Sequence, residues 1–150
     1  MFVTAKDDGL IPYVLTQILD ACVNGVTLSD PDLPDNPIVY ANRAFEAISG
    51  YAQEDIVGRN CRFLQGADRD QEGLNVIRAA LAKREACVVT LRNYRKNGEL
   101  FLNRLSIRPL VDREGKVIYY LGVQYDVTDQ VRTREELEKL QFERARGARG

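Results

Sequence analysis

Residues 58–66, with the sequence GRNCRFLQG, combine side chains that can do chemistry together. The thiol of Cys61 stands between the amide of Asn60 and the guanidinium of Arg62, and a second amide, Gln65, follows four residues after the thiol. Amides offer both hydrogen-bond donors and acceptors, and a guanidinium is the side chain best suited to a phosphate. The segment can therefore bind a planar, hydrogen-bonding, phosphorylated ligand and place a sulfur against it.

The sequence contains no histidine, and this excludes several kinds of chemistry. Ser-His-Asp and Cys-His catalysis, metal ligation by histidine and a phosphoaccepting histidine all require an imidazole. The three cysteines, Cys22, Cys61 and Cys87, are odd in number and widely spaced, which favours free thiols over a disulfide framework or a zinc site. We interpret Cys22 and Cys87 as small apolar residues that are buried or partly buried, and Cys61 must act without an imidazole.

Charge and hydropathy exclude several classes of partner. The 21 basic and 22 acidic residues leave a net charge of −1, which gives no electrostatic case for nucleic acid or anionic lipid. No apolar run approaches the roughly 20 residues of a membrane span. The first residues, MFVTAKDD, lack the apolar stretch of a signal peptide, so a cytoplasmic location is expected.

Hydrophobic periodicity and turn signals predict the elements that must position the thiol. An amphipathic helix is predicted before Asn24-Gly25, which is a helix stop signal. Strands are expected at 26–29, 38–41, 86–95, 99–110 and 116–126, and helical segments at 43–48, 53–56, 61–64, 70–83 and 129–146. This order predicts an α+β domain, with one antiparallel sheet carrying helices on one face. We expect an N-terminal cap helix (1–24), a core (25–128) and a C-terminal helix with a frayed tail (129–150).

Alternation along the three long strands predicts an apolar sheet face that also carries amides. Its expected members are Leu91, Asn93, Phe101, Asn103, Leu105, Ile107, Ile118, Tyr120, Gly122 and Gln124. A buried amide without partners costs about 1–3 kcal/mol, so this face suits a ligand with a polar edge and an apolar body. Alternatively, these amides bond to loop backbone, or one strand is turned the other way.

The opposite face of the last strand is also apolar, with Tyr119, Leu121, Val123 and Tyr125. A strand that is apolar on both faces is expected to be covered on both sides. The end helices or a partner chain are the available cover.

Three arginines follow the thiol: Arg62, Arg69 and Arg78. A guanidinium fork binds phosphate well, so the three together indicate a phosphate site. Taken alone, Arg78 on a helix is equally consistent with simple solvent exposure.

Residues 58–66 resemble the flavin-binding signature of LOV (light-oxygen-voltage) domains, the blue-light branch of the PAS superfamily. The resemblance extends from about Gly25 to Gln130. Within this family, the chain resembles the bacterial short LOV photoreceptors. It includes the segments DPDLPDNP (30–37), NYRKNG (93–98), FLN (101–103) and GVQYDVT (122–128). It implies the PAS fold, a five-stranded antiparallel sheet with helices on one face, flanked by N-terminal and C-terminal helices.

The resemblance also implies FMN as cofactor and a role for each matching residue. Cys61 corresponds to the photoreactive thiol that forms a reversible adduct at flavin C4a, and Gln124 to the residue that relays the signal. Ring-edge partners are implied at Asn60, Gln65, Asn93, Asn103 and Gln124, and phosphate contacts at Arg62, Arg69 and Arg78. Pocket walls are implied at Thr27, Ser29, Leu64, Leu105, Ile107, Tyr120 and Gly122. Leu74, Leu102 and Tyr120 depart from relatives that carry arginine, tryptophan and phenylalanine there.

The implied function is a blue-light photoreceptor for sensory transduction that binds FMN noncovalently and is not an enzyme. It would signal through its flanking helices or through rearrangement of a homodimer formed by them. The alternatives are a PAS-type interaction or redox-sensing module without photochemistry, and a thiol- or flavin-dependent enzyme. The residues do not identify a downstream effector, and they fit either a complete short photoreceptor or a sensor cut from a larger protein.

Overall fold

The computed structural model describes residues 10–149. Its helices are α1 (Leu10–Asp20), α2 (Arg43–Ser49), α3 (Gln53–Ile56), the 3-10 helix η1 (Cys61–Gln65), α4 (Glu72–Lys83) and α5 (Thr128–Arg149). Its strands are β1 (Gly25–Ser29), β2 (Ile38–Ala41), β3 (Cys87–Tyr94), β4 (Leu100–Val111) and β5 (Val117–Asp126). Every predicted element is present, and the predicted bounds differ from the observed ones by at most three residues. The part of the N-terminal prediction that covers residues 1–9 lies outside the described residues.

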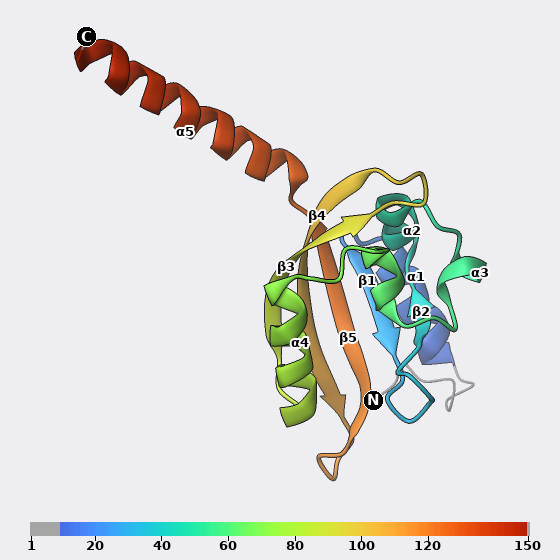
Figure 1. Cartoon of the computed structure of the whole chain (residues 1–150). Coiled ribbons are helices and arrows are strands. Elements are labelled where there is room, and N and C mark those ends of the chain that lie inside the picture. The colour runs from blue at the N-terminus through green and yellow to red at the C-terminus, as the bar shows by residue number, and fades with distance from the viewer. Residues whose placement is uncertain (1–9, 150) are drawn as a thin grey trace.

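The five strands form one antiparallel sheet in the order β2-β1-β5-β4-β3 (Figure 1). The hairpin predicted at Asn97-Gly98 joins β3 to β4, and Gly98 has the positive φ of +88° that this turn requires. β5 lies at the centre, paired with β1 on one side and β4 on the other. The predicted α+β sheet is confirmed, and the strand that carries Gln124 is its middle strand.

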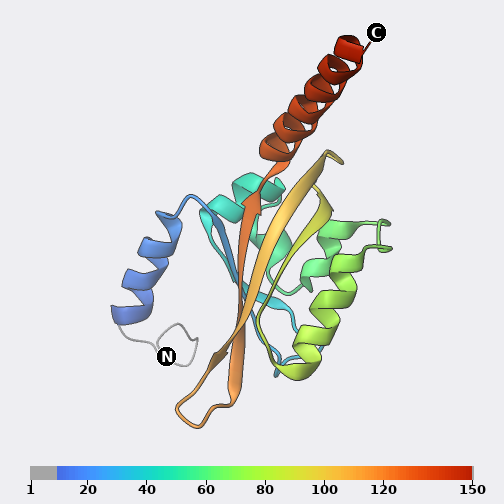
Figure 2. The same ribbon diagram turned by 90° about the vertical axis from the view of Figure 1, so that its left-hand side faces the viewer.

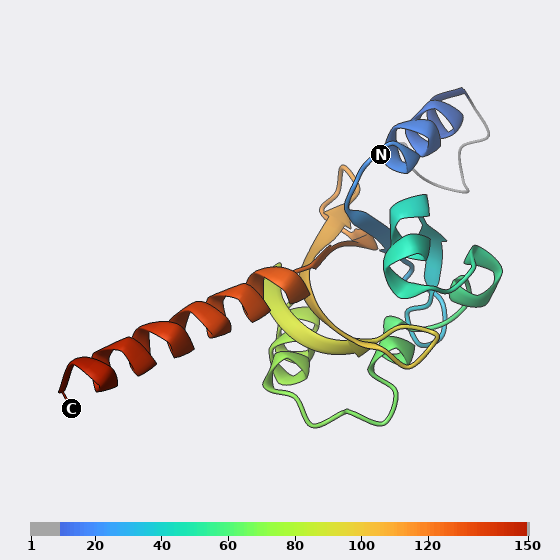
Figure 3. The same ribbon diagram turned by 90° about the horizontal axis from the view of Figure 1, so that it is seen from above.

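Helices α2, α3 and α4 and the short η1 cover one face of the sheet, as predicted (Figures 1 and 3). The apolar residues of α4 pack on β3, β4 and β5 in one core cluster: Leu74, Val89, Leu91, Leu105, Ile107 and Tyr120. A second cluster joins β2 to α2, α3 and η1: Ile38, Ala41, Phe45, Ile56 and Leu64. A cavity lies between these clusters and the sheet, so packing of the helices determines its walls.

Helix α4 begins at Glu72, whereas the sequence predicted a start at Asp70. Gln71 has extended backbone angles, φ −138° and ψ 131°, and its side chain bonds to β3. This tertiary contact holds Gln71 out of the helix and therefore shortens it. At the other end of the chain, α5 continues to Arg149 instead of fraying after Arg146.

The outer face of β5, where cover by the end helices or a partner chain was expected, is covered only in part. Helix α5 projects away from the sheet, and α1 and α4 lie on opposite sides of it (Figures 1 and 2). Tyr119 is buried. On the same face, however, Tyr125 is 41% exposed and Val88 is 56% exposed. Part of this apolar face is thus open to solvent. Among the described residues, no helix is long and apolar enough to cross a membrane.

Candidate functional site

A cavity of about 200 Å³ opens between the sheet, η1 and α4. The structure brings most of the predicted site residues to its walls: Thr27, Ser29, Asn60, Cys61, Arg62, Gln65, Arg69, Arg78, Leu105, Ile107, Tyr120, Gly122 and Gln124. The other three, Leu64, Asn93 and Asn103, are not lining residues but are buried to 3% exposure or less. Residues from β1, η1, α4, β4 and β5 thus line the same cavity.

The cavity also has lining residues that were not predicted as site residues: Asn36, Ile38, Leu74, Ile77 and Leu81. The helical spacing of Leu74, Ile77 and Leu81 marks an apolar face, and that signal could have placed them against a ligand. Asn36 gives no such signal, because its position depends on the loop between β1 and β2. It has a positive φ of +47°, which few residues other than glycine adopt.

Cys61 begins η1, and the preceding amide fixes that turn. The Asn60 side chain caps η1 by accepting a hydrogen bond of 3.0 Å from the Arg62 backbone N–H. Its Nδ2 donates to the Asp35 carbonyl at 2.7 Å, which ties the turn to the loop after β1. Cys61 therefore projects from a turn that Asn60 anchors at its N-terminal end, and its side chain lies at the cavity wall.

The electrostatic surroundings keep the Cys61 thiol protonated. Burial raises the pKa of the thiol, and the Arg62 guanidinium opposes this only in part, so the net shift is upward. A raised pKa means that the neutral thiol persists across physiological pH. Cys61 is therefore positioned as a thiol and not as a preformed thiolate nucleophile.

Three amides from the neighbouring strands β3, β4 and β5 meet near the cavity. Asn93, Asn103 and Gln124 are each 3% exposed or less. Asn103 Nδ2 donates to Asn93 Oδ1 at 2.9 Å, and Gln124 Nε2 donates to Thr27 Oγ1 at 3.2 Å. The predicted common face is therefore confirmed, and the alternative of a reversed strand is excluded.

Two of these amides have a buried oxygen without a hydrogen-bond partner: Asn103 Oδ1 and Gln124 Oε1. Asn36 Oδ1, on another residue that lines the cavity, has none either. Buried polar atoms are almost always paired, so orphaned acceptors beside a cavity indicate a ligand that donates to them. A flavin has alternating donors and acceptors along its ring edge and hydroxyl groups on its ribityl chain. The amide donors and the orphaned acceptors around this cavity therefore fit a flavin.

Gly122 leaves room for a flat ligand beside Gln124. A Cβ placed there would lie 2.6 Å from Thr27 Oγ1 and 3.0 Å from Gln124 Nε2. Any side chain at this position would displace Thr27 or the Gln124 amide and would enter the cavity. The backbone of β5 can therefore approach a planar ring closely at Gly122.

The three arginines lie at the rim of the cavity. Arg62 forms an ion pair with Asp35, and Arg69 Nε donates to the Gly66 carbonyl at 3.2 Å. Arg78 Nη1 donates to Asn75 Oδ1 at 3.2 Å, and both Arg69 and Arg78 are otherwise exposed. Arg78 thus lines the cavity and is solvent-exposed as well. Guanidinium groups at one rim can hold a phosphate that extends from a ligand inside.

The described residues contain no group of histidine, cysteine, aspartate or glutamate that could hold a metal ion.

Comparison with known proteins identifies the family. The PAS domain model matches residues 23–129. A "Blue-light photoreceptor" of Listeria innocua is 42% identical over 87% of this chain and 51% of its own length. The "Blue-light-activated histidine kinase 1" of Erythrobacter litoralis is 47% identical over 75% of this chain and 31% of its own length. The chain thus spans about half or less of these relatives.

A solved structure described as "Flavin Analogue Sheds Light on Light-Oxygen-Voltage Domain Mechanism" is 42% identical and superposes with a TM-score of 0.73. The match covers 89% of this chain and 99% of that one, so the likeness includes nearly the whole of both molecules. Because the PAS model matches most of the chain and this LOV structure is similar over nearly its whole length, the chain belongs to the LOV domains of the PAS superfamily.

Proposed function

We propose that this LOV domain is a blue-light photoreceptor that binds FMN noncovalently and whose Cys61 sulfur bonds reversibly to the flavin C4a. The proposal is carried by the cavity that brings the Cys61 thiol together with the orphaned buried acceptors of Gln124 and Asn36. The names of the blue-light relatives support the same function. The protein would act as a sensor and not as an enzyme.

Each group of site residues has its own task in this proposal. A bound flavin would supply blue-light absorption and an electrophilic carbon. Asn93 and Asn103 would exchange their mutual hydrogen bond for contacts with the ring edge, and Gln124 would hold the ring near N5. Arg62 would exchange Asp35 for the phosphate, with Arg69 and Arg78 beside it. Leu105, Ile107 and Tyr120 would exclude water from the ring.

Cys61 requires no base for its step. With FMN bound, Cys61 would supply both the sulfur for C4a and the proton for N5, so no other group would have to give or take a proton. The raised pKa of Cys61 favours this, because the thiol still carries its proton when light arrives. A thiol held beside the ring would react in a unimolecular step. It would therefore not need the activation by histidine that catalytic cysteines in other proteins receive.

Absorbance spectroscopy tests the proposal directly. We expect a yellow protein whose blue band bleaches under blue light and recovers in darkness. Because the pKa of Cys61 is raised, its thiol form persists past the value of about 8.5 of a free thiol, so the bleaching yield should stay constant from about pH 6 to about pH 9. A yield that falls around pH 8.5 would contradict the assigned thiol state. A colourless protein that binds no FMN would instead favour a PAS-type interaction module.

Gln124 would carry the signal from the cavity to β1. After proton transfer, Gln124 must face a donor in place of an acceptor, and it can respond by rotating its amide. A Cβ built on Gly25 would lie 3.3 Å from Gln124 Oε1, so this amide lies directly against β1. Rotation of the amide would also break or remake the 3.2 Å bond to Thr27.

Asn42 links this part of β1 to α1. Its Oδ1 accepts from the N–H groups of Val26 (2.8 Å) and Phe45 (3.1 Å). Its Nδ2 donates to the carbonyls of Leu19 (2.8 Å) and Asn24 (3.0 Å). The side chain is 0% exposed and uses all four of its hydrogen-bonding positions. A shift of β1 beside Gln124 would therefore be passed to the end of α1.

Asn42→Ser should uncouple α1 from the photochemistry. Serine keeps an acceptor that can cap α2, but it cannot hold both carbonyls, and the protein should lose about 1–3 kcal/mol of stability. Bleaching and dark recovery should persist, whereas the light-dependent change in hydrogen exchange of residues 13–20 should disappear. Asp20→Asn is the matched control, because it keeps the acceptor for the Arg43 N–H. An α1 response equal to that of the wild type would refute the link.

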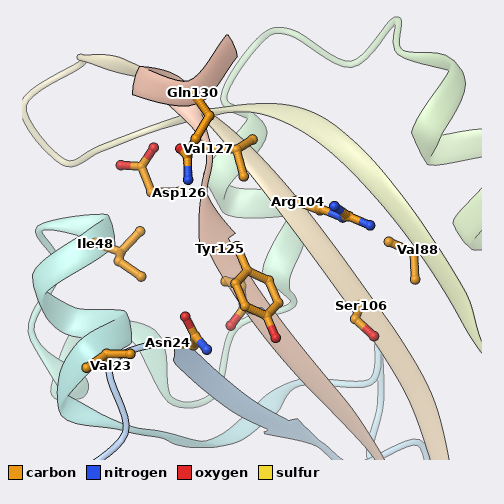
Figure 4. Close-up of a pocket in the computed structure, with 11 residues that line it drawn as sticks. Val23, Asn24, Ile48, Val88, Arg104, Ser106, Tyr125, Asp126, Val127 and Gln130 are labelled. Atoms are coloured by element: carbon orange, nitrogen blue, oxygen red, sulfur yellow. The ribbon is translucent and has the colours of Figure 1, made fainter. Parts of the chain in front are cut away.

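The exposed apolar surfaces indicate a homodimer. The side chains Tyr13 and Ile18 on α1, and Leu140 and Phe142 on α5, are each more than half exposed. The outer face of the sheet has an open hollow beside the start of α5, with Tyr125 between Arg104 and Ile48 (Figure 4). A second copy would cover these surfaces. Light-scattering mass, measured in darkness and in light on the sample used for absorbance, tests this arrangement.

A further inference from the structure

The loop of residues 66–71 connects the thiol-bearing η1 to α4, and it runs along the free edge of the sheet. β3 is an edge strand, so the outward N–H and C=O groups of Arg92 have no strand partner. The Gln71 side chain takes that place: its Oε1 accepts from the Arg92 N–H at 2.7 Å, and its Nε2 donates to the Arg92 carbonyl at 2.9 Å. Nε2 also donates to the Asp68 carbonyl at 2.7 Å.

A charged pair fastens the same loop to the same strand. The Arg92 guanidinium binds both Asp68 carboxylate oxygens, at 2.7 and 2.8 Å, and donates to the Asp70 carbonyl at 3.1 Å. The Tyr94 hydroxyl donates to Asp68 Oδ2 at 2.7 Å. These hydrogen bonds to Arg92 and Tyr94 lower the pKa of Asp68 to about 2, so the pair is fully ionised at physiological pH. We call Asp68, Gln71, Arg92 and Tyr94 the edge clasp.

On the strand side, the edge clasp flanks a predicted ring-edge residue. Asn93 lies between Arg92 and Tyr94, and its Nδ2 donates at 3.0 Å to the Arg92 carbonyl, the same oxygen that Gln71 holds. Because Gln71 also donates to the Arg92 carbonyl, Asn93 can turn its amide toward a ligand and the Arg92 carbonyl oxygen still has a hydrogen-bond partner. The clasp thereby lowers the cost of freeing Asn93 for binding.

On the loop side, the edge clasp flanks the arginines of the cavity rim. Arg69 lies between Asp68 and Gln71 in the same loop, and α4 begins directly after Gln71 with a 3.1 Å bond from the Leu74 N–H to the Gln71 carbonyl. Arg78 lies farther along that helix, and both arginines line the cavity. One set of contacts thus joins the strand that carries Asn93 to the segment that carries the cationic rim.

We propose that the edge clasp is a positioning device that sets the span between Asn93 and the rim arginines, and so makes the site selective for a phosphorylated flavin over the same flavin without its phosphate. The inference deepens the proposed function and rests on it. Holding the backbone of the 66–71 loop and the start of α4 in place before binding avoids the entropy of ordering the segments that carry Arg69 and Arg78. That saving is realised only by a ligand that carries a phosphate.

Asp68→Asn tests this through two affinities measured by fluorescence titration of flavin-free protein. We expect the Kd for FMN to rise about tenfold and the Kd for riboflavin to change by less than about twofold, equivalent to about 1.4 kcal/mol for the phosphate alone. Asp70→Asn is the matched control: it removes the same charge from the same loop, but Asp70 holds Arg92 only through its main-chain oxygen. Its FMN affinity should equal or exceed that of the wild type.

A second variant and a measurement without ligand complete the test. Tyr94→Phe removes one hydrogen bond to Asp68 and should raise the ratio of the Kd for FMN to the Kd for riboflavin by about two- to threefold. If Asp68→Asn does not fold, this variant tests the proposal in its place. Amide exchange of residues 66–71 in the flavin-free protein should accelerate in both variants. Equal losses of FMN and riboflavin affinity, or no loss, would overturn the clasp as a selectivity device. Failure of the wild type to bind any flavin would instead refute the proposed function itself.

Discussion

Replacing Cys61 with alanine should abolish reversible bleaching while leaving FMN binding within about twofold of the wild type, because the side chain supplies a reacting sulfur and few binding contacts. The cavity acceptors and the rim arginines are unchanged by this substitution. The variant should therefore be purified yellow and should fluoresce more strongly, since light energy no longer enters bond formation. Absorbance during and after a blue-light pulse measures the first effect, and titration of flavin-free protein measures the second.

The other two cysteines provide the controls for Cys61→Ala. Cys87 packs at the border of the cluster beneath α4, as predicted, whereas Cys22 follows the end of α1 and is exposed, so its predicted burial is wrong. Neither lines the cavity, so alanine at either position should leave bleaching and recovery intact. Reversible bleaching of the blue band in Cys61→Ala would show that another group reacts and would refute the assignment.

Gln124→Leu should separate the photochemistry from the signal. Leucine removes the orphaned Oε1 and only one long hydrogen bond, the 3.2 Å contact to Thr27. Loss of an unpaired buried oxygen, which costs about 1–3 kcal/mol, should offset the lost bond, so the flavin-free protein should be at least as stable as the wild type. Bleaching should persist, because Cys61 is untouched. The light-dependent change in α1 exchange and in scattering should fall to the level of Cys61→Ala.

The comparison with Cys61→Ala makes the Gln124 result decisive. That variant cannot form the bond, so it defines the response of the helices when no signal is generated. A full helix response in Gln124→Leu would show that another residue relays the change. A loss of bleaching would instead show that Gln124 holds the ring against Cys61, which is a positioning role and not a relay.

Local patterns predicted most of the fold and much of the site. Strand alternation assigned Asn93, Asn103 and Gln124 to one face, because the side-chain period of two is a property of the strand itself. Helical spacing located α4 to within two residues of its start and marked Leu74, Ile77 and Leu81 as its inner face. The signature around Cys61 specified the thiol, its flanking amide and its guanidinium before any tertiary contact was considered.

The sequence by itself determined which reactive groups this protein has, which segments carry them and which face of each strand they occupy, because these depend on neighbouring residues. Only the tertiary structure decided how distant segments meet. Asn42 joins α1, β1 and α2, and Gln71 leaves its helix to close the edge of β3, 21 residues away in sequence. Helix α5 projects away from the sheet, and Tyr125 and Val88 are partly exposed on the outer face, where periodicity predicted cover by the end helices or a partner chain. Such contacts depend on packing between segments, and local periodicity does not contain that information.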